Sequence, residues 1–259
     1  KQVQELFLIS SLIMKNLNHP CITKFYGMNF GSIQNRSIID PTILMEYFPN
    51  GTLQDTIEKE KRGLIDIEWN STKKIINLIG ISHAMKYLHK QGVIHRNLKP
   101  KTIMLDEHFY PHLAGFTFAK NFPFPLTKSS EIELSEHVGT PLYMAPELLN
   151  YKNYGIGVDI YAFSILAFEV VSGFTLKQRA FGYWYDIAKG IRPEFADDVT
   201  DPMQDLISRC WNDDTDERPS FDEIYEQLST DYRSYCKYDL DDDEIENYIK
   251  MINKLECNQ

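Results

Sequence analysis

Long apolar stretches are missing from this sequence of 259 residues. No run reaches the roughly 18 apolar residues that a membrane-spanning helix needs. The first 20 residues carry a periodic helix pattern in place of the charged, apolar and small-residue regions of a signal peptide. We therefore expect no membrane insertion and a cytoplasmic location.

Basic side chains are in deficit. The chain has 27 Lys and Arg residues against 37 Asp and Glu residues, which gives a net charge of −10. Nucleic acids and anionic membrane surfaces attract clustered Lys and Arg. Neither is expected as a main partner of this chain.

Cysteine is scarce and never paired in a CxxC motif. The four cysteines are far apart in the sequence, at Cys21, Cys210, Cys236 and Cys257. This spacing favours neither a disulfide framework nor a structural zinc site. We expect reduced, mostly buried thiols.

Apolar residues are abundant enough for a sizeable core, at 43% of the chain. In residues 2–17 they fall at spacings of three and four, which is typical of one face of a helix. They are Leu6, Ile9, Ile13 and Leu17. Asn18-His19-Pro20 would end this helix. Two antiparallel strands are predicted in residues 21–30 and 37–48, followed by a turn at Pro49-Asn50-Gly51.

Helices dominate the predicted structure after residue 52. Residues 71–90 have a broad apolar face, and residues 158–172 are apolar nearly all round, so the second helix should form the centre of the core. Shorter helices are predicted in 183–190, 201–211 and 220–229.

The C-terminal residues 231–259 begin with an acidic cluster, which favours a short terminal helix because acids stabilise a first helical turn. A calcium loop starting at Asp239 is excluded. Glu244 stands where such a loop needs Gly, and Lys250 stands where it needs Glu.

A series of short motifs follows the order found in one large family. They are "NHPCITKFYG", "ILMEYFPNGTL", "HRNLKPKTI", "LAGFTFAK", "GTPLYMAPELL", "VDIYAFSILAFEVVSG" and "CWNDDTDERPSF". From about residue 5 to about residue 230 the chain resembles a eukaryotic protein kinase domain, in particular the tyrosine kinase-like group of serine/threonine kinases. The resemblance implies a two-lobed α+β fold. It places a partial small lobe in residues 1–48, a mainly helical large lobe in 49–230 and an acidic tail in 231–259.

The same resemblance implies a slot for an adenine ring. Met45 would be the gatekeeper, and Glu46, Tyr47 and Phe48 would offer backbone groups to the ring. Met104 would form the floor of the slot. A purely core-filling role for Met104 is the alternative.

Parts that hold the family's large lobe together are present. Ala145-Pro146-Glu147 matches its APE motif, and Arg218 is the expected ion-pair partner of Glu147. Asp159 resembles the residue that holds the backbone of the catalytic loop. The stack of apolar residues that joins the lobes would comprise Met14, Phe25, His95 and Phe116.

The groups that perform phosphoryl transfer in this family are replaced. Asn97 stands in place of the catalytic Asp, and an amide cannot take a proton from a hydroxyl. Thr102 and Gly115 replace the usual magnesium ligands, so we expect no metal there. Ser10 occupies the position of the helix Glu that pairs with the phosphate-binding Lys.

The glycine-rich loop of the family is also missing, because no GxGxxG occurs in the sequence. In the family this loop and the strand with the phosphate-binding Lys precede the first helix. The small lobe is therefore expected to be incomplete here, with the first helix and the last strands only. Whether the missing segment exists upstream of Lys1 stays open.

These substitutions favour a pseudokinase that acts in signalling as a scaffold by binding a protein partner, such as an active kinase or its substrate. An active serine/threonine kinase that uses ATP is the alternative, and "GTPLYMAPE" would favour serine/threonine substrates. The second alternative is a nucleotide sensor. No cofactor is required, although ATP binding without magnesium is possible.

Charged and hydroxyl groups remain near the catalytic loop. Arg96, Lys99 and Thr140 are interpreted as scaffolding of the loops, and Lys99 can either meet a phosphate or form a salt bridge at the surface. Three serines lie where kinases carry activating phosphates: Ser129, Ser130 and Ser135. A phosphate there could pair with Arg96, and an exposed polar loop is the alternative.

Overall fold

The computed structural model of the chain describes residues 2–29, 42–64, 68–122, 140–150, 153–173, 176 and 189–257. Its α-helices there are α1 (Gln2–Asn16), α2 (Leu53–Lys61), α3 (Ser71–Lys90), α4 (Pro146–Leu149), α5 (Gly157–Ser172), α7 (Asp201–Cys210), α8 (Phe221–Thr230) and α9 (Asp242–Cys257). Short 3-10 helices are η1 (Pro100–Thr102), η2 (Phe116–Phe118), η3 (Pro141–Tyr143) and η4 (Tyr232–Tyr235). The helix expected in 183–190 and the serines at 129, 130 and 135 lie outside the described residues, apart from a turn at 189–190.

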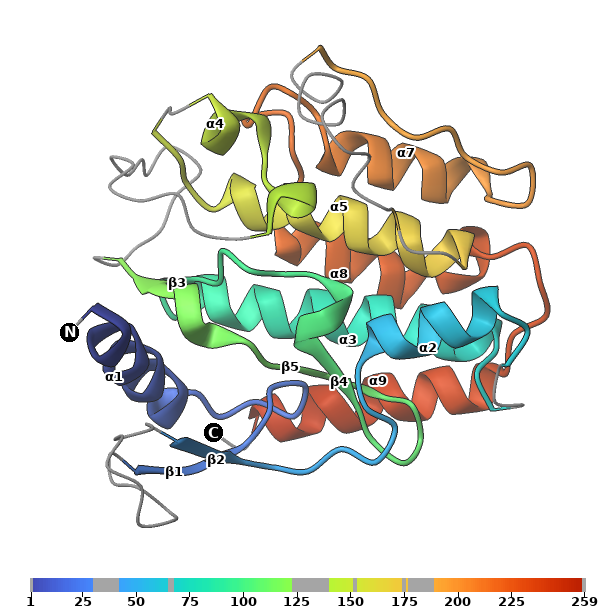
Figure 1. Cartoon of the computed structure of the whole chain (residues 1–259). Helices are drawn as coiled ribbons and strands as arrows, with labels where there is room; N and C mark the ends of the chain where they lie inside the picture. Colours follow the sequence, from blue (N-terminus) through green and yellow to red (C-terminus); the bar gives the residue numbers. More distant parts are fainter. Residues whose placement is uncertain are drawn as a thin grey trace.

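The strands form three antiparallel pairs within the described ranges. β1 (Phe25–Asn29) pairs with β2 (Thr42–Met45), β3 (Val93–Ile94) with β6 (Lys120–Asn121), and β4 (Ile103–Leu105) with β5 (Pro111–Leu113). Figure 1 shows β1 and β2 next to α1 at one end of the molecule, and the larger helices stacked beyond them. This α+β arrangement confirms the predicted fold class. None of the helices in the described ranges is long and apolar enough to cross a membrane.

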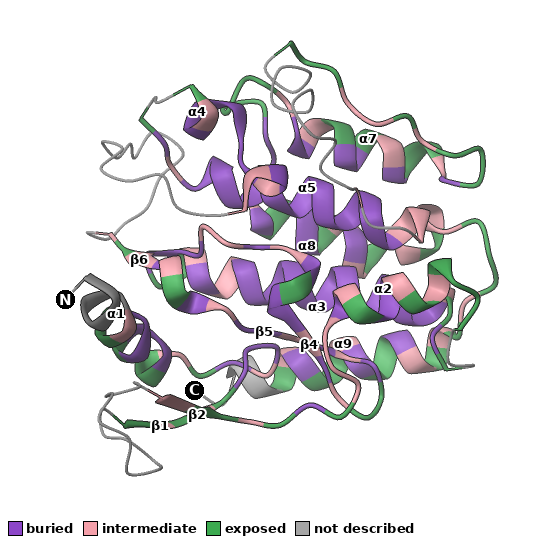
Figure 2. Ribbon diagram, viewed as in Figure 1, coloured by how far each residue is buried: buried purple, intermediate pink, exposed green. Residues whose placement is uncertain are grey.

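Helices α3 and α5 form the centre of the core, as the apolar patterns predicted. α3 begins at Asn70, whose side chain accepts a hydrogen bond from the backbone N–H of Lys73 and so caps the helix. α5 is buried along nearly its whole length because its residues are apolar on every face. Both helices are purple over most of their length in Figure 2, with α8 packed against α3 and α7 against α5.

The buried face of α1 differs from the predicted stripe. Ile13 is buried as expected, but Ile9 is 42% exposed. The helix instead buries Ser10, Ser11 and Met14 beside Ile13, toward η2 and β1. Two small serines allow a close approach that longer side chains would prevent, and their hydroxyls are satisfied by the carbonyl of Phe7 at 2.9 and 2.8 Å. The prediction for Ile9 was therefore wrong.

Helix α9 packs along α3 on the side away from α5 (Figure 1). Its Tyr248 is buried directly over Gly80 of α3. A Cβ atom at position 80 would lie 2.1 Å from the Tyr248 hydroxyl oxygen and 2.6 Å from Pro111 Cγ, so only glycine fits this contact. Lys73 of α3 forms a salt bridge with Glu244 of α9. The acidic terminal segment is thus joined to α3 by both packing and charge.

Glu147 and Arg218 form the ion pair that the motifs predicted. The guanidinium donates to the two carboxylate oxygens at 2.7 and 3.0 Å, and also to the carbonyl oxygens of Gly157 at 2.9 Å and Asn212 at 2.8 Å. Arg218 is completely buried. The pair therefore links α4, the start of α5 and the segment before α8.

Glu169 lies on α5, and its carboxyl group is buried in the core. The hydroxyl of Tyr143 donates to it at 2.7 Å, and the backbone N–H of Leu176 donates at 2.5 Å. Burial nevertheless raises the pKa of Glu169 to about 7, because removal from water disfavours the charged carboxylate more than these two donors stabilise it. The segment that carries Tyr143 is thus hydrogen-bonded to a group that titrates near neutral pH.

Removing one partner of the buried ion pair should be strongly destabilising, because the other charge stays buried and unpaired. We expect Arg218→Ala to lower the free energy of unfolding by about 3 to 5 kcal/mol in urea denaturation. The control is Lys250→Ala, which breaks an exposed pair with Glu246 at 3.2 Å and should cost at most about 0.5 kcal/mol. Equal losses in the two variants would contradict the assigned role of Arg218.

Glu169 should make stability fall as the pH rises. Between pH 4.5 and about 7 the unfolded chain has already released this proton while the folded chain still holds it. The free energy of unfolding should therefore drop by up to about 3 kcal/mol over this window from this group alone. Glu169→Gln should remove that component, so that the variant gains on the wild type as pH rises. Exposed Glu246→Gln serves as control, and a pH-independent difference for Glu169→Gln would refute the assignment.

Candidate functional site

Asp159, at the start of α5, holds the backbone of the loop "HRNLKPKTI". Its carboxylate accepts the backbone N–H groups of His95 and Arg96, both at 2.8 Å, and lies 3.0 Å from Nε2 of His89. Burial alone would raise the pKa of Asp159, but these partners outweigh it and lower the pKa, so the group stays ionised. The predicted role of Asp159 is confirmed.

Arg96 adopts a left-handed backbone conformation, with φ of +59°. This conformation is strained for a residue with a Cβ. The side chain compensates by donating from Nε to the carbonyl of Phe118 at 2.6 Å and from a terminal nitrogen to the hydroxyl of Tyr154 at 2.8 Å. Arg96 therefore acts as scaffolding between the loop and the segment after η2, as its interpretation from the sequence predicted.

His95 is fully buried between the loop and η2. Nε2 lies 2.9 Å from the carbonyl of Ala114, and Nδ1 accepts the N–H of Asn97 at 3.3 Å. Burial lowers the pKa of His95, so the ring is neutral and its proton sits on Nε2. The ring of Phe116 meets it edge-on at 5.1 Å. Met14 and Phe116 are buried in the same apolar cluster and Phe25 packs against it, which agrees with the predicted stack.

Asn97 points its amide toward the loop that carries Gly115. Its Nδ2 donates to the Gly115 carbonyl at the long distance of 3.4 Å. Oδ1 is buried and has no hydrogen-bond partner among the described residues. The amide oxygen of Asn97 is therefore closed off from solvent, and the side chain offers no basic group to take a proton from a hydroxyl.

Thr102 uses its hydroxyl to close the loop. Oγ1 lies 2.9 Å from the carbonyl of Lys99 and 3.1 Å from that of Asn97, and it accepts the N–H of Lys99 at 3.2 Å. Thr102 Oγ1, which stands at the position of a magnesium ligand in the family, is therefore hydrogen-bonded within its own loop. Its methyl group faces Gly115.

Gly115 is left-handed, with φ of +80°. A Cβ atom placed here would lie 2.4 Å from Thr102 Cγ2 and 2.9 Å from Thr102 Cβ, closer than any real contact. Position 115 thus cannot hold a longer side chain while Thr102 stays where it is. The two residues that replace the family's magnesium ligands are in direct steric contact.

Lys99 extends toward the segment before η3. Nζ donates to the hydroxyl of Thr140 at 2.5 Å. Burial lowers the pKa of Lys99, and the nearby charge of Lys101 lowers it further. The contact links the two loops, which agrees with the interpretation of Lys99 and Thr140 as scaffolding.

Of the residues predicted for the adenine slot, Met45 is the last residue of β2, Glu46 to Phe48 follow it, and Met104 lies in β4. Met45 is 40% exposed and Tyr47 is 84% exposed, whereas Phe48 is buried. The N–H of Glu46 donates to the carbonyl of Lys24 at 3.1 Å. This backbone donor is therefore engaged within the small sheet.

His112 joins two members of that predicted slot and was missed in the sequence. Its ring lies 4.7 Å from the ring of Phe48, and its Cα pairs with that of Met104 across β4 and β5. Only the register of these two short strands brings the three residues together. No local pattern in the sequence signals it.

Ser10, at the position of the family's pairing Glu, lies on the buried face of α1 with its hydroxyl bonded to the carbonyl of Phe7. It offers no charge toward the site. Glu169 was also missed, although a single acid within the apolar run "SILAFEVV" was a detectable signal.

Comparison with known proteins agrees with this geometry. A family model for the protein kinase domain matches residues 4–228. The chain is 32% identical over 221 residues to a probable serine/threonine-protein kinase, drkC, of Dictyostelium discoideum, covering 83% of this chain and 28% of drkC. It is 28% identical over 223 residues to the serine/threonine-protein kinase STY17 of Arabidopsis thaliana, covering 84% of this chain and 36% of STY17.

A third relative, the protein kinase and PP2C-like domain-containing protein of Arabidopsis thaliana, is 27% identical over 248 residues, covering 83% of this chain and 36% of that protein. The chain spans only 28% to 36% of the length of these three relatives. The match to the family model covers most of the chain, and the ion pair of Glu147 with Arg218 and the loop held by Asp159 occur where the motifs predict them. The chain belongs to the protein kinase domain family.

Proposed function

We propose that this domain is a pseudokinase, which keeps the kinase fold to bind a protein partner in signalling and does not transfer phosphate. The contact between Thr102 and Gly115 carries this proposal. A magnesium ion takes oxygen ligands at about 2.0 to 2.1 Å in near-octahedral geometry, usually including a carboxylate. Gly115 has no side-chain oxygen. The Thr102 hydroxyl accepts the backbone N–H of Lys99 and shares its single proton between two carbonyls, so it is held within its own loop. The residues present do not fit a magnesium ion.

Asn97 also supports the pseudokinase proposal, because it stands where a kinase has the base that activates the substrate hydroxyl. A positioned base contributes about 10² to 10⁴-fold to proton transfer, and an amide supplies none of it. The Oδ1 of Asn97 is also closed off from solvent, so a substrate hydroxyl would have to displace the loop before it could contact this atom. Both features argue against activation of a hydroxyl at this position.

The groups that hold the fold favour a binding role. Asp159, Arg218 and the contact of His95 with Phe116 are all in place, while the replaced groups are those that touch substrate or metal. We propose that its partner is another protein, such as an active kinase or a kinase substrate, and that no cofactor is required.

An active serine/threonine kinase is the second candidate, favoured by the names of the relatives, which call them serine/threonine kinases. In that case the missing groups would have to come from elsewhere in a longer protein. A nucleotide sensor that binds ATP without magnesium at Met45 to Phe48 and Met104 is a third outcome that the same experiment distinguishes.

We expect ATP to leave the melting temperature unchanged, both with and without Mg²⁺. We also expect the purified full-length chain to transfer no phosphate to a generic protein substrate. Transfer that is lost in Lys99→Ala and kept in the matched control Lys101→Ala would overturn the pseudokinase proposal. A rise in melting temperature with ATP alone would identify the sensor.

The steric contact at the lost metal position can be measured by a double-mutant cycle. Gly115→Ala should cost about 2 to 4 kcal/mol of unfolding free energy, since it combines a left-handed backbone with a clash against Thr102. Thr102→Ser keeps the hydroxyl and removes Cγ2, so Gly115→Ala should cost at least about 1 kcal/mol less in that background. Additive effects in urea denaturation would show that the two side chains do not compete for space.

A further inference from the structure

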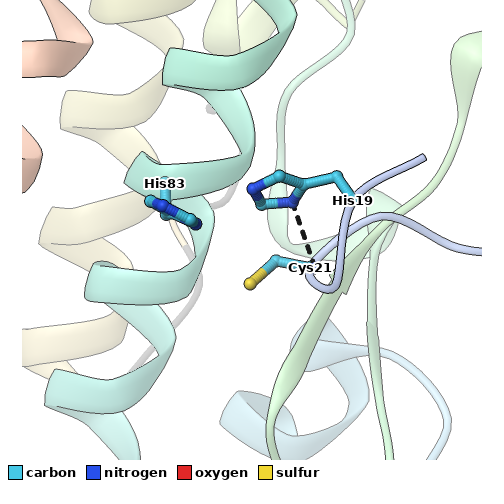
Figure 3. Close-up of side chains that lie close together, drawn as sticks. All are labelled: His19, Cys21 and His83. Atoms are coloured by element: carbon cyan, nitrogen blue, oxygen red, sulfur yellow. Dashed lines mark hydrogen bonds between the residues drawn. The ribbon is translucent and has the colours of Figure 1, made fainter. Parts of the chain in front are cut away.

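Two histidines and a cysteine meet at the junction between α1, β1 and α3. His19 and Cys21 lie on the loop between α1 and β1, and His83 lies on α3. All three are buried, and the nitrogen or sulfur atoms that they offer lie within 4.8 Å of one another. Figure 3 shows the ring of His19 and the sulfur of Cys21 directed toward the side chain of His83.

The hydrogen bonds of His19 leave one of its two ring nitrogens without a partner. Nδ1 accepts the backbone N–H of Cys21 at 3.1 Å, the dashed line in Figure 3. Nε2 is buried and has no hydrogen-bond partner among the described residues. A polar atom left in this way costs about 1 to 3 kcal/mol, which a ligand at this position would offset.

We propose that His19, Cys21 and His83 form a binding site for a zinc ion. Neutral imidazoles and a thiolate are the ligands that Zn²⁺ prefers, and two histidines with one cysteine leave a fourth, open position for water. Binding releases the thiol proton of Cys21 to solvent. The ring proton of His19 moves from Nε2 to Nδ1, which frees Nε2 for the metal. Nδ1 can then no longer accept the backbone N–H of Cys21, so this hydrogen bond is lost and the two N–H groups have to separate as the loop moves.

The site has to contract when the metal enters. Bonds of about 2.0 to 2.3 Å in a tetrahedron separate the ligand atoms by roughly 3.5 Å, so the most distant pair must approach by about 1 Å. His19 and Cys21 are on a loop, which can make this movement more easily than α3. The hydroxyl of Tyr248 lies 3.4 Å from Cys21 Sγ and can donate a hydrogen bond to the thiolate.

A metal here would connect the loop after α1 to α3 of the large lobe. It would fix the junction of the two lobes without any nucleotide, and it stands independently of the proposed pseudokinase role. No local pattern in the sequence indicates this cluster, because His83 is far along the chain from the "HPC" tripeptide and only the packing of α3 brings them together.

The full chain should be refolded or expressed in the presence of Zn²⁺ alone, because the buried site will load slowly once folded. We expect close to one zinc per chain after desalting, measured by atomic emission. X-ray absorption at the zinc edge of the wild type should show one sulfur and two imidazole ligands, a reading that needs no variant to fold. Zinc content near zero, or a zinc bound only by oxygen ligands, would overturn the proposal.

Variants then identify the ligands. Cys21→Ser and His83→Gln should each retain at least tenfold less zinc than the wild type. When the proteins are refolded with Co²⁺, the wild type should show a sulfur-to-cobalt charge-transfer band and Cys21→Ser should not. The matched controls are Cys236→Ser, a half-buried thiol outside the cluster, and His108→Gln on an exposed turn. Equal zinc loss in the control variants would place the metal elsewhere and contradict the assignment.

Discussion

The carboxylate of Asp159 sets the geometry of the site. A fully buried carboxylate is tolerated only when its oxygens accept hydrogen bonds, and here they are met by two successive backbone N–H groups, at His95 and Arg96, and by His89. Satisfying those oxygens bends the loop at Arg96 into a left-handed conformation. The position of Asn97 follows from that bend. The loop's shape therefore depends on a group that takes no part in chemistry and is independent of which residue occupies position 97.

The helices differ in how well their sequences predict them. The bounds of α3 and α5 were predicted within one residue, since both are long and buried and their apolar periodicity reports directly on packing. The buried face of α1 was not predicted. Ser10 and Ser11 are buried on the helix that contacts η2, whereas a pattern based on hydrophobicity alone assigns small polar residues to solvent. Close helix approach favours small side chains whether or not they are apolar.

Within the site, residue identities could be predicted and contacts could not. The motifs align Asn97, Thr102 and Gly115 with the positions where the family carries catalytic groups. That Thr102 fills the space beside Gly115 depends on a backbone angle and on the approach of two loops, neither of which is encoded locally. The positions of His112 and Glu169 also depend on strand register and on the depth of α5 in the core.

The contact between Thr102 and Gly115 also bears on how such a domain can change over generations. While Thr102 stays in place, any side chain added at position 115 would pass through a strained intermediate. A smaller residue at position 102 would have to come first. The pair therefore restricts the order in which these two positions can be substituted.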